Sequence, residues 1–323
     1  MESTALSEPP ASLATIEARL EKISPAAAGI SLFDFVGPSA LMLEPRPGSH
    51  IDVHLPGELI RQYSLLTPLC SPGRYVVAVK REPAGRGGSR YLHDEARPGS
   101  CLRIGLPRNN FELDESCDRN LLLAGGIGIT PLYGMFIRLQ ELKRQVEMHY
   151  WASTPDLALF RTELMQSPLA TLHHSTHADR PTIADVVKRA SPGTKVYCCG
   201  PARMIEDAIA SVTQPSQLRI ERFSALEPGA GDDPVSGFTV HLARTKRDIV
   251  VASGQTILGA LTEAGIDVAY SCEEGVCGAC ETRMLSGDPL HRDSIRSPDE
   301  HARQGTIMIC CSLSRSSRLV LDI

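Results

Sequence analysis

The amino-acid sequence predicts a multi-domain protein in which an antiparallel β-barrel, a doubly wound parallel α/β sheet and a small α+β domain follow one another. Three observations predict this order. Short alternating apolar runs fill the first third of the chain, apolar strands alternate with helical stretches in the middle, and a cysteine-rich loop lies in a compact segment near the C-terminus. With 323 residues, the chain has room for two or three domains of about 100–150 residues each.

Residues 13–113 carry the pattern of the barrel. The alternating runs are separated by Gly and Pro, and they read ATIEARLEKI, ISLFDFV, SHIDVHL, RQYSLL, RYVVAVKR and CLRIGL. Several short strands at such close spacing favour a small antiparallel barrel. Residues 1–12 show no such pattern, and we expect them to form a mobile tail.

Residues 114–226 change to the rhythm of a parallel sheet. The apolar run NLLLAGG leads into a helical stretch, PLYGMFIRLQELK, and a second run, VEMHYWAS, follows. Later, KVYCCG leads into PARMIEDAIASV. Strands that alternate with helices in this way predict a doubly wound α/β domain.

Residues 227–234, EPGAGDDP, concentrate Gly, Pro and Asp without periodicity, and we interpret them as a linker. Residues 235–323 follow as a compact α+β unit. It contains FTVHLAR, RDIVVA, a helical TILGALTEAG, the cysteine loop and a last strand, RLVLDI.

Composition narrows the classes of function. A hydrophobic share of 42% and a net charge of −5 are ordinary for a globular protein and give no reason to expect nucleic-acid binding. The N-terminal sequence has no basic segment followed by an apolar run, and no later stretch approaches the ~18 apolar residues of a membrane span. We therefore expect a cytoplasmic protein that acts away from membranes on proteins and cofactors.

Ten cysteines raise the question of disulfides, but three of them fall within nine consecutive residues. Disulfide frameworks are typical of short secreted chains, so metal ligation is the better interpretation. Most of the cysteines outside the ligand set are expected to be small core residues, and they are Cys70, Cys101, Cys117, Cys198, Cys199 and Cys311.

The loop Cys272-Glu-Glu-Gly-Val-Cys277-Gly-Ala-Cys280 is the strongest signal in the sequence. Its C-x4-C-x2-C spacing is that of plant-type 2Fe–2S clusters. A four-cysteine zinc site is the alternative interpretation. Such sites usually present two CxxC pairs, whereas here the fourth cysteine belongs to no such pair. A Rieske-type centre needs two His ligands as well. Gly275 and Gly278 tolerate positive φ and let the backbone approach the cluster.

The fourth thiolate is expected from the adjacent pair Cys310 and Cys311. Side chains alternate along a strand, so we expect only one of the two to face the cluster loop. The residues by themselves leave open which one it is.

A glycine-rich turn follows the first strand of the predicted sheet. Gly125, Gly126 and Gly128 would let the backbone approach a pyrophosphate, and Pro131, after Thr130, is expected at the first helical position. Pro131 replaces the third Gly of a standard GxGxxG motif, and no acidic residue ends the next strand. A plain tight turn is therefore an equal alternative for this segment alone.

A second turn repeats this architecture. Cys199-Gly200-Pro201 ends a later strand, and Pro201 is again expected to open a helix. Ligands of open α/β sheets lie beyond the carboxyl ends of the strands, so the two turns would delimit one crevice, in which a nicotinamide could rest.

The barrel holds a second candidate region. RQYS at residues 61–64 begins a strand, KR at 80–81 ends the strand after it, and GRGGS at 85–89 precedes a helical stretch. Ser89 suits an N-cap, and glycines with positive charge favour a terminal phosphate. Tyr63 offers a flat face to an aromatic ring, and Ser64 a hydrogen bond at its edge. Each piece alone also fits an ordinary strand or a flexible loop.

Taken in order, Arg-x-Tyr-Ser, GRGGS, GGIGITP, CGP and the C-x4-C-x2-C loop resemble the phthalate dioxygenase reductase family. That family includes vanillate demethylase reductases and belongs to the ferredoxin–NADP reductase superfamily. The resemblance covers about residues 13–323. It implies an FMN-binding barrel, an NADH-binding sheet and a C-terminal β-grasp ferredoxin domain.

The resemblance also implies site residues. FMN would be held by Arg61, Gln62, Tyr63, Ser64, Lys80, Arg81, Gly87, Gly88, Ser89 and Phe223, although a core role for Phe223 is equally open. The nicotinamide nucleotide would be held by Gly125, Gly126, Gly128, Thr130, Pro131, Cys199, Gly200 and Pro201. The family pattern favours Cys310 beside Cys272, Cys277 and Cys280 as the fourth cluster ligand, since Val is common at position 311.

The implied function is electron transfer from NADH through FMN and the 2Fe–2S cluster to a separate terminal oxygenase of the Rieske type. The chemistry belongs to the cofactors, so Ser64, Thr130 and Cys199 are expected to position them without acid–base or nucleophilic work. Glu273 and Glu274 could steer docking of the oxygenase, or form a solvated acidic loop. We expect a monomer.

Two alternatives keep part of this interpretation. The same domain order also resembles reductase modules of cytochrome P450 monooxygenases, and a 2Fe–2S redox sensor would use the cluster without turnover. NADH is preferred to NADPH because no arginine cluster follows VEMHYWAS, although Arg161 is not far along the chain. FMN is preferred to FAD because of GRGGS and the family resemblance.

Overall fold

The computed structural model describes residues 14–57, 59–175, 180–224 and 236–323. It divides into two compact units, one of Thr15–Phe223 and one that holds Ser224–Ile323. The expected mobile tail at residues 1–12 and the expected linker at residues 227–234 lie outside the described residues.

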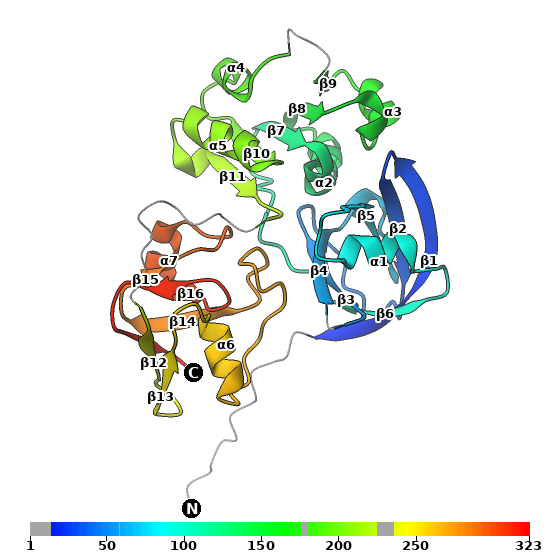
Figure 1. The fold of residues 1–323 in the computed structure, drawn as a ribbon. Helices are drawn as coiled ribbons and strands as arrows, with labels where there is room; N and C mark the ends of the chain where they lie inside the picture. The colour runs from blue at the N-terminus through cyan, green and yellow to red at the C-terminus, as the bar shows by residue number, and fades with distance from the viewer. Residues whose placement is uncertain (1–13, 58, 176–179, 225–235) are drawn as a thin grey trace, which may run out of the picture. The chain divides into compact units, whose positions relative to one another are not determined.

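The first part of the larger unit is a closed antiparallel barrel (Figure 1). Its strands are β1 (Thr15–Ala27), β2 (Ile30–Val36), β3 (His50–Leu55), β4 (Leu59–Ser64), β5 (Arg74–Lys80) and β6 (Cys101–Gly105), in the order β4-β3-β6-β1-β2-β5. Leu65 bridges to Val77, and the Leu66 amide donates to the Val76 carbonyl at 2.8 Å, so the two outer strands of the sheet meet. This closure confirms the predicted barrel.

Alternation of side chains explains why these residues form strands. In β1, burial alternates from exposed Thr15 to buried Leu20, so apolar side chains face the barrel core and polar ones face solvent. The 3₁₀ turn η1 (Thr67–Leu69) follows β4, and the short helix α1 (Gly88–Asp94) follows the glycine loop after β5.

The second part of the larger unit is a five-stranded sheet in which every neighbouring pair is parallel. Its strands are β7 (Arg119–Gly125), β8 (Gln145–Ala152), β9 (Ala170–His174), β10 (Lys195–Cys199) and β11 (Leu218–Glu221), in the order β11-β10-β7-β8-β9. Its helical segments are η2 (Gly126–Gly128), α2 (Ile129–Glu141), η3 (Pro155–Leu157), α3 (Arg161–Met165), α4 (Ile183–Arg189), α5 (Ala202–Ser211) and η4 (Pro215–Gln217).

Helices cover both faces of this sheet, as predicted for a doubly wound domain. Cys198 and Cys199 are neighbours on β10 and point to opposite faces. Cys198 packs in the core beneath α4 and α5, whereas Cys199 packs in the core beneath α2.

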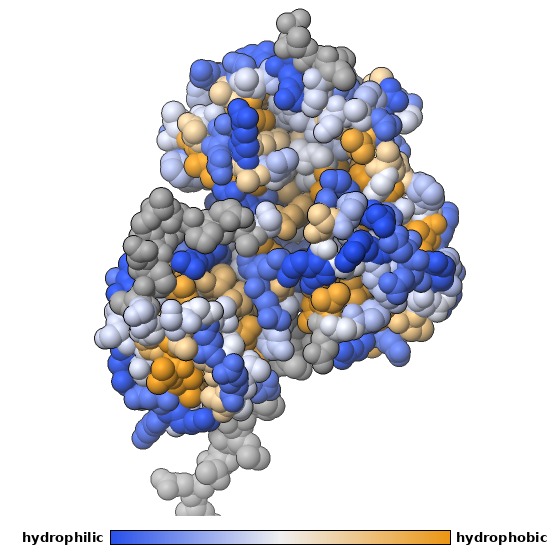
Figure 2. All heavy atoms as spheres, viewed as in Figure 1, coloured by the Kyte–Doolittle hydropathy of each residue, from blue (hydrophilic) through white to orange (hydrophobic). Residues whose placement is uncertain are grey.

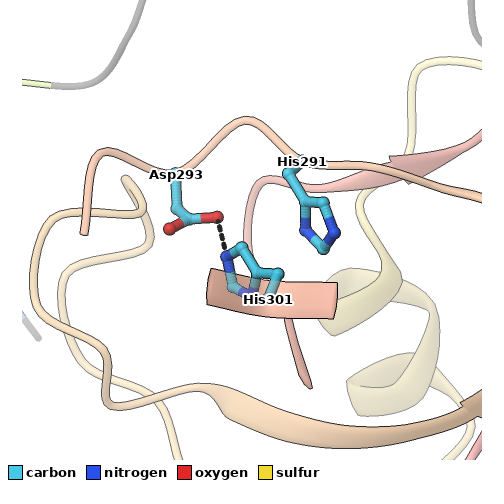
Figure 3. A group of neighbouring side chains, drawn as sticks. All are labelled: His291, Asp293 and His301. Carbon is cyan, nitrogen blue, oxygen red and sulfur yellow. Dashed lines mark hydrogen bonds and ion pairs between the residues drawn. The ribbon is translucent and has the colours of Figure 1, made fainter. Parts of the chain in front are cut away.

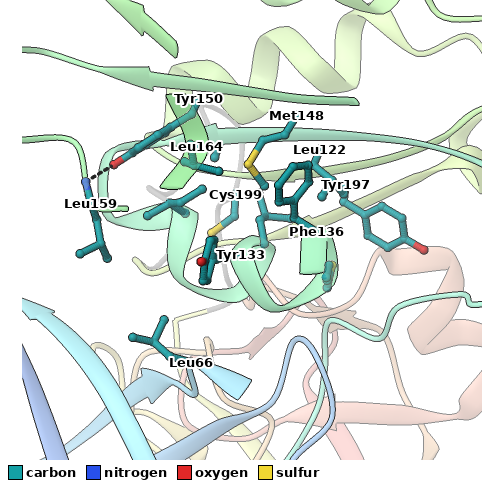
Figure 4. Close-up of a cluster of buried hydrophobic side chains, with 14 of the residues drawn as sticks. Leu66, Leu122, Tyr133, Phe136, Met148, Tyr150, Leu159, Leu164, Tyr197 and Cys199 are labelled. Atoms are coloured by element: carbon teal, nitrogen blue, oxygen red, sulfur yellow. Dashed lines mark hydrogen bonds between the residues drawn. The ribbon is translucent and has the colours of Figure 1, made fainter. Parts of the chain in front are cut away.

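One of the hydrophobic clusters of the larger unit contains residues of both the barrel and the parallel sheet. Leu66 of the barrel belongs to the same buried cluster as Leu122, Tyr133 and Met148 of the sheet and its helix (Figure 4). At Gly134 in α2, a Cβ atom would fall 2.3 Å from Thr67 Oγ1 of the barrel, so glycine allows the helix to approach η1 closely. The contact between η1 and α2 therefore sets the position of strand β4, which carries Tyr63, relative to the glycine turn after β7.

The smaller unit is a mixed five-stranded sheet with one helix packed on it. Its strands are β12 (Phe238–Leu242), β13 (Arg247–Val251), β14 (Glu281–Ser286), β16 (Thr306–Met308) and β18 (Arg318–Leu321), in the order β13-β12-β18-β14-β16. The other elements are α6 (Ile257–Glu263), α7 (Pro298–Gln304) and the pair β15 (Pro289–Leu290) and β17 (Leu313–Ser314). Leu258 and Leu261 of α6 are buried in its core.

Hydrophilic residues dominate the surface visible in Figure 2, and hydrophobic ones lie between them in small patches. Scattered apolar side chains of this kind are usual on globular proteins. Among the helices that the structure describes, none combines the length and the apolar character needed to span a membrane.

Candidate functional site

The cysteine loop lies between α6 and β14, and its cysteines are buried. Cys272, Cys277 and Cys280 are each less than 5% exposed, and so is Cys310. The Cys272 thiol contacts the thiols of both Cys277 and Cys310. Cys280 lies in the same core cluster as Cys310. The fold therefore brings together the four cysteines proposed as ligands.

Backbone amides of this loop point at the sulfurs. The Glu274 amide donates to Cys272 Sγ at 3.3 Å, and the Ala279 amide lies 3.5 Å from Cys277 Sγ. The backbone is left-handed at Glu273, Gly275 and Gly278, with φ of 59°, 71° and 73°. The predicted positive φ at the two glycines is confirmed. Buried thiols with amide donors form the environment that an iron–sulfur cluster requires.

The expectation about the Cys310–Cys311 pair needs correction. The two residues lie in a turn after β16, so strand alternation does not separate them. Cys310 contacts Cys272, as the family pattern implies for a ligand. Cys311 also approaches the loop, because a Cβ atom at Gly275 would fall 2.6 Å from its Sγ. Both thiols thus lie near the cluster loop.

Among the other cysteines, Cys198 and Cys199 are buried as expected, and burial raises the pKa of Cys198 to about 12. Cys101 is exposed and Cys117 is only half-buried, so neither is a core residue. Both lie in the larger unit, away from the cysteine loop in sequence.

The two glycine turns of the parallel sheet touch one another. A Cβ atom at Gly125 would fall 3.2 Å from the Gly200 Cα, and one at Gly128 would fall 2.2 Å from the Cys199 carbonyl oxygen. The turns follow β7 and β10, which are neighbours although they are not consecutive along the chain. The order of strands reverses between them, and this is where open α/β sheets bind ligands.

Two details of these turns differ from the sequence prediction. Helix α2 begins at Ile129, after the 3₁₀ turn Gly126–Gly128, so Pro131 is its third residue. Pro201 is the N-cap of α5 and precedes its first residue. Each proline still lies where its missing N–H breaks no helical hydrogen bond. Thr130 is buried, and its hydroxyl donates to the Ile127 carbonyl at 2.9 Å.

Sequence reasoning missed Glu221, which ends β11 and pairs in register with Cys199. Its Oε2 is buried and finds no hydrogen-bond partner within the described part of the chain. Burial raises its pKa from 4.5 to about 8, and burial also raises the pKa of Cys199 well above its ordinary value. Burial therefore favours the protonated, neutral form of both groups. The sequence signal that could have identified Glu221 is its position as an acidic residue at the end of a strand, two residues before Phe223.

In the barrel, Arg61 packs on the glycine loop. Its guanidinium donates to the Arg86 carbonyl at 3.0 Å, and a Cβ atom at Gly88 would fall 2.5 Å from its Cγ. Gly87 has a φ of 93°, which favours glycine. Tyr63 packs against the barrel core, and burial raises its pKa; Ser64 is buried on the same strand.

Four other predicted flavin residues have partners within the barrel. Arg81 donates two hydrogen bonds to Asp94, at 2.9 and 2.8 Å, and Lys80 lies 3.3 Å from a Glu82 carboxylate oxygen. The side-chain amide of Gln62 donates to Asp52 at 2.8 Å. Ser89 is not the N-cap of α1, because Gly87 takes that place; its hydroxyl accepts a hydrogen bond from the Glu82 amide at 3.1 Å.

Phe223, at the end of the larger unit, is 45% exposed. A large aromatic side chain at that exposure is not part of a core, so the alternative of a core phenylalanine is wrong. Arg161, considered for NADPH, is exposed at the start of α3.

A hollow lined by Asp118, Arg119, Lys143, Arg144 and Gln145 lies at the opposite edge of the sheet, where β7 and β8 begin. Because ligands of open parallel sheets bind at the carboxyl ends of the strands, we assign no site to it.

Fold and sites together define a modular iron–sulfur oxidoreductase. The family model described as "2Fe-2S iron-sulfur cluster binding domain" matches residues 240–315. The phenoxybenzoate dioxygenase subunit beta of Ectopseudomonas oleovorans is 41% identical over 320 residues, which are 97% of this chain and 99% of that one. The solved structure of phthalate dioxygenase reductase superposes with a TM-score of 0.68 at 31% identity, covering 96% of this chain and 98% of that one. The chain belongs to the phthalate dioxygenase reductase family.

A third relative is larger. An intact type IV self-sufficient cytochrome P450 monooxygenase superposes with a TM-score of 0.86 at 32% identity, and the match covers 96% of this chain and 41% of that one.

Membership of the family confirms the resemblance read from the motifs. The chain is an oxidoreductase with a 2Fe–2S cluster binding domain. The solved phthalate dioxygenase reductase is described as a modular structure for electron transfer from pyridine nucleotides to the 2Fe–2S cluster of that protein, and another relative is the reductase subunit of phthalate 4,5-dioxygenase. An enzyme of this class turns over, which sets the redox-sensor alternative aside.

Proposed function

We propose that this chain is the reductase of a Rieske-type aromatic-ring oxygenase or O-demethylase system, and that it works as a monomer in the cytoplasm. The observation that carries the proposal is the near full-length match to reductase components of oxygenases, with all four cysteines buried together. The functional divisions we propose are residues 13–113 for FMN, 114–226 for NADH and 235–323 for the cluster.

When bound, the nucleotide, flavin and cluster supply hydride transfer followed by single-electron transfer. The residues of the chain bind and orient them. We assign the nucleotide to the crevice between the two glycine turns, where Gly125, Gly128 and Gly200 leave the backbone bare. We assign Thr130 and Cys199 to the floor of this crevice. Both residues are buried, and burial raises the pKa of the Cys199 thiol well above its ordinary value.

For the flavin, we assign the ring to Tyr63 and Ser64 and the phosphate to the loop of Gly87, Gly88 and Ser89. Arg61 already lies on this loop and supplies positive charge. Arg81 and Lys80 contribute less in this assignment, since each faces a carboxylate. Phe223 is exposed and able to cover an aromatic ring.

At the cluster, Cys272, Cys277, Cys280 and Cys310 are the proposed ligands. Glu273, next to the first of them, is exposed and carries negative charge on the surface of the loop. Charge of this kind steers the encounter with a basic patch on a partner protein more than it adds affinity.

The test is a visible spectrum of the purified chain before and after anaerobic NADH, with extraction to identify the flavin. We expect the flavin and iron–sulfur bands to bleach together, and FMN to be recovered. A reconstituted assay with Rieske-type oxygenases then tests the partner. Absence of electron delivery to every Rieske-type oxygenase supplied would contradict the assigned partner class.

A second candidate is a reductase for a cytochrome P450, and the TM-score of 0.86 to the self-sufficient monooxygenase favours it. Offering a P450 and a Rieske-type oxygenase to the same reduced chain separates the two candidates. We expect faster transfer to the Rieske-type protein, and faster transfer to the P450 would reverse the assignment.

A further inference from the structure

Residues 291–296, which we call the clamp segment, lie directly on the cysteine loop. The Ser294 amide donates to the Gly275 carbonyl at 2.9 Å, and a Cβ atom at Gly275 would fall 2.9 Å from the Asp293 Cα. Gly275 stands between Cys272 and Cys277 in sequence. The contact is therefore between two backbones, made at the middle of the loop that carries three of the four ligands.

The clamp segment holds the loop at a second point. Arg296 donates two hydrogen bonds to the Glu281 carboxylate, at 2.6 and 2.9 Å. Glu281 follows Cys280 directly and begins β14. Charge-assisted pairs with two hydrogen bonds are the stronger kind, and this one is only partly exposed. The segment thus contacts the loop before and after its last two cysteines.

A buried His–Asp pair fixes the clamp segment itself (Figure 3). The Asp293 carboxylate lies 2.8 Å from Nε2 of His301, on α7, and both side chains are fully buried. The same carboxylate accepts hydrogen bonds from the Ile295 and Arg296 amides, at 3.3 and 3.1 Å. Nδ1 of His301 lies 3.1 Å from the Thr306 hydroxyl on β16. Removing His301 would leave Oδ1 of Asp293 buried without this partner, and removing Asp293 would do the same to Nε2 of His301, which is costly.

His291, Asp293 and His301 also place possible ligand atoms within 4.8 Å of one another, as a metal site would. The ring geometry argues against an ion. The two imidazole rings stack at 3.9 Å with an angle of 1° between their planes. A metal bound by imidazole lies in the plane of the ring, and two parallel stacked planes share no such point. Both nitrogens of His301 already have partners.

We propose that the His301–Asp293 pair is a positioning device that holds the cysteine loop through the clamp segment and thereby sets the reduction potential of the cluster. The inference rests on the proposed cluster ligands. The amides of Glu274 and Ala279 that point at sulfur lie on either side of Gly275 in sequence. Amide donors stabilise the more negative, reduced cluster, so a looser loop lowers the potential.

The experiment measures the cluster potential and the EPR spectrum of the reduced cluster in the full chain, with iron content determined for each variant. The variants are Asp293→Ala, His301→Ala and the size-matched Asp293→Asn. His241→Ala and Asp248→Ala are matched controls, because Nδ1 of His241 lies 2.6 Å from Asp248 in another His–Asp pair, which joins β12 to β13 in the same unit.

We expect the alanine variants to lower the ratio of reduced to oxidised cluster about tenfold at a fixed applied potential, which is about 59 mV for one electron. Their EPR lines should broaden, and Asp293→Asn should recover part of the shift. Potentials and spectra equal to wild type at full iron content would overturn the proposal.

If Asp293→Ala takes up no cluster, the reduction potential of the Asp293→Asn variant tests the proposal. A potential below that of the wild type supports the positioning role, and an unchanged potential contradicts it. A wild-type chain without any 2Fe–2S signal would instead refute the proposed cluster ligands, so the two failures are distinguishable.

Discussion

The cysteine loop and the flavin–nucleotide unit gather their candidate residues in different ways. Three of the four proposed cluster ligands come from nine consecutive residues, and the fourth comes from the turn after β16. The proposed flavin and nucleotide residues are spread from Arg61 to Phe223. Covalent spacing brings the cluster thiols near one another, whereas the dispersed residues meet only when the barrel closes and the sheet forms. Cluster binding is thus the more local property.

The largest expected effect breaks the cluster and leaves the other unit intact. Cys310→Ala should lose nearly all cluster iron and electron delivery to an acceptor protein, because the fourth thiolate is gone. NADH should still reduce the flavin. Cys311→Ala is the matched control and should keep its iron. Iron analysis and anaerobic spectra measure both, and iron lost from Cys311→Ala but kept by Cys310→Ala would reverse the ligand assignment.

The next effect breaks the flavin–nucleotide unit and leaves the cluster in place. In Gly128→Ala the new Cβ would lie 2.2 Å from a backbone oxygen, so the two glycine turns must move apart. A displacement of about 1 Å costs on the order of 100-fold in rate, so NADH-driven flavin reduction should fall by about that factor. Stopped-flow kinetics measure the rate, and iron content should not change.

Gly193→Ala is the control for this substitution. Gly193 lies in the turn before β10 and has a φ of 81° but open space around the position of a Cβ atom, so only modest backbone strain is expected. An equal loss of rate in both variants would show that the closeness of the two turns is not what matters.

A smaller effect separates two arginines of the barrel. Arg61→Met should weaken FMN binding about tenfold or more, because a charge-assisted hydrogen bond is worth about 1.5–3 kcal/mol. Arg81→Met should change it much less, since Arg81 is paired with Asp94. Fluorescence titration of the flavin-free chain gives both affinities. Equal losses would mean that Arg81 leaves Asp94 when the flavin binds.

The smallest effect concerns Glu221 and depends on pH. Its folded pKa of about 8 lies above its ordinary 4.5, so the folded chain binds the proton more tightly than the unfolded chain does. Between these values stability falls as pH rises, and Glu221→Gln removes that loss. Calorimetry should therefore show a Tm gain of a few degrees at pH 9 and little change at pH 5. A gain that does not grow with pH would contradict the burial of this carboxyl group.

The prediction errors lie at the ends of elements, where tertiary contacts choose between local possibilities. Ser89 has the chemistry of an N-cap, but Gly87 caps α1 in a left-handed conformation while the Ser89 hydroxyl accepts from Glu82. Helix α2 begins earlier than Pro131 suggests because Gly128 already has right-handed helical backbone angles, with φ of −62° and ψ of −6°. The alternative helix starts differ little in local free energy, so the sequence pattern does not predict which one forms.

Patterns along the chain are enough to predict the three types of fold, the spacing of the cluster ligands and the positive φ of Gly275 and Gly278. These follow from periodicity and from the backbone freedom of glycine, which act over a few residues. The tertiary structure alone brings the two glycine turns into contact, buries the Oε2 atom of Glu221 on the strand that pairs with Cys199, and forms the buried pair of Asp293 and His301 next to the cysteine loop. These contacts join segments far apart in the chain, and their energy depends on burial, which no local pattern records.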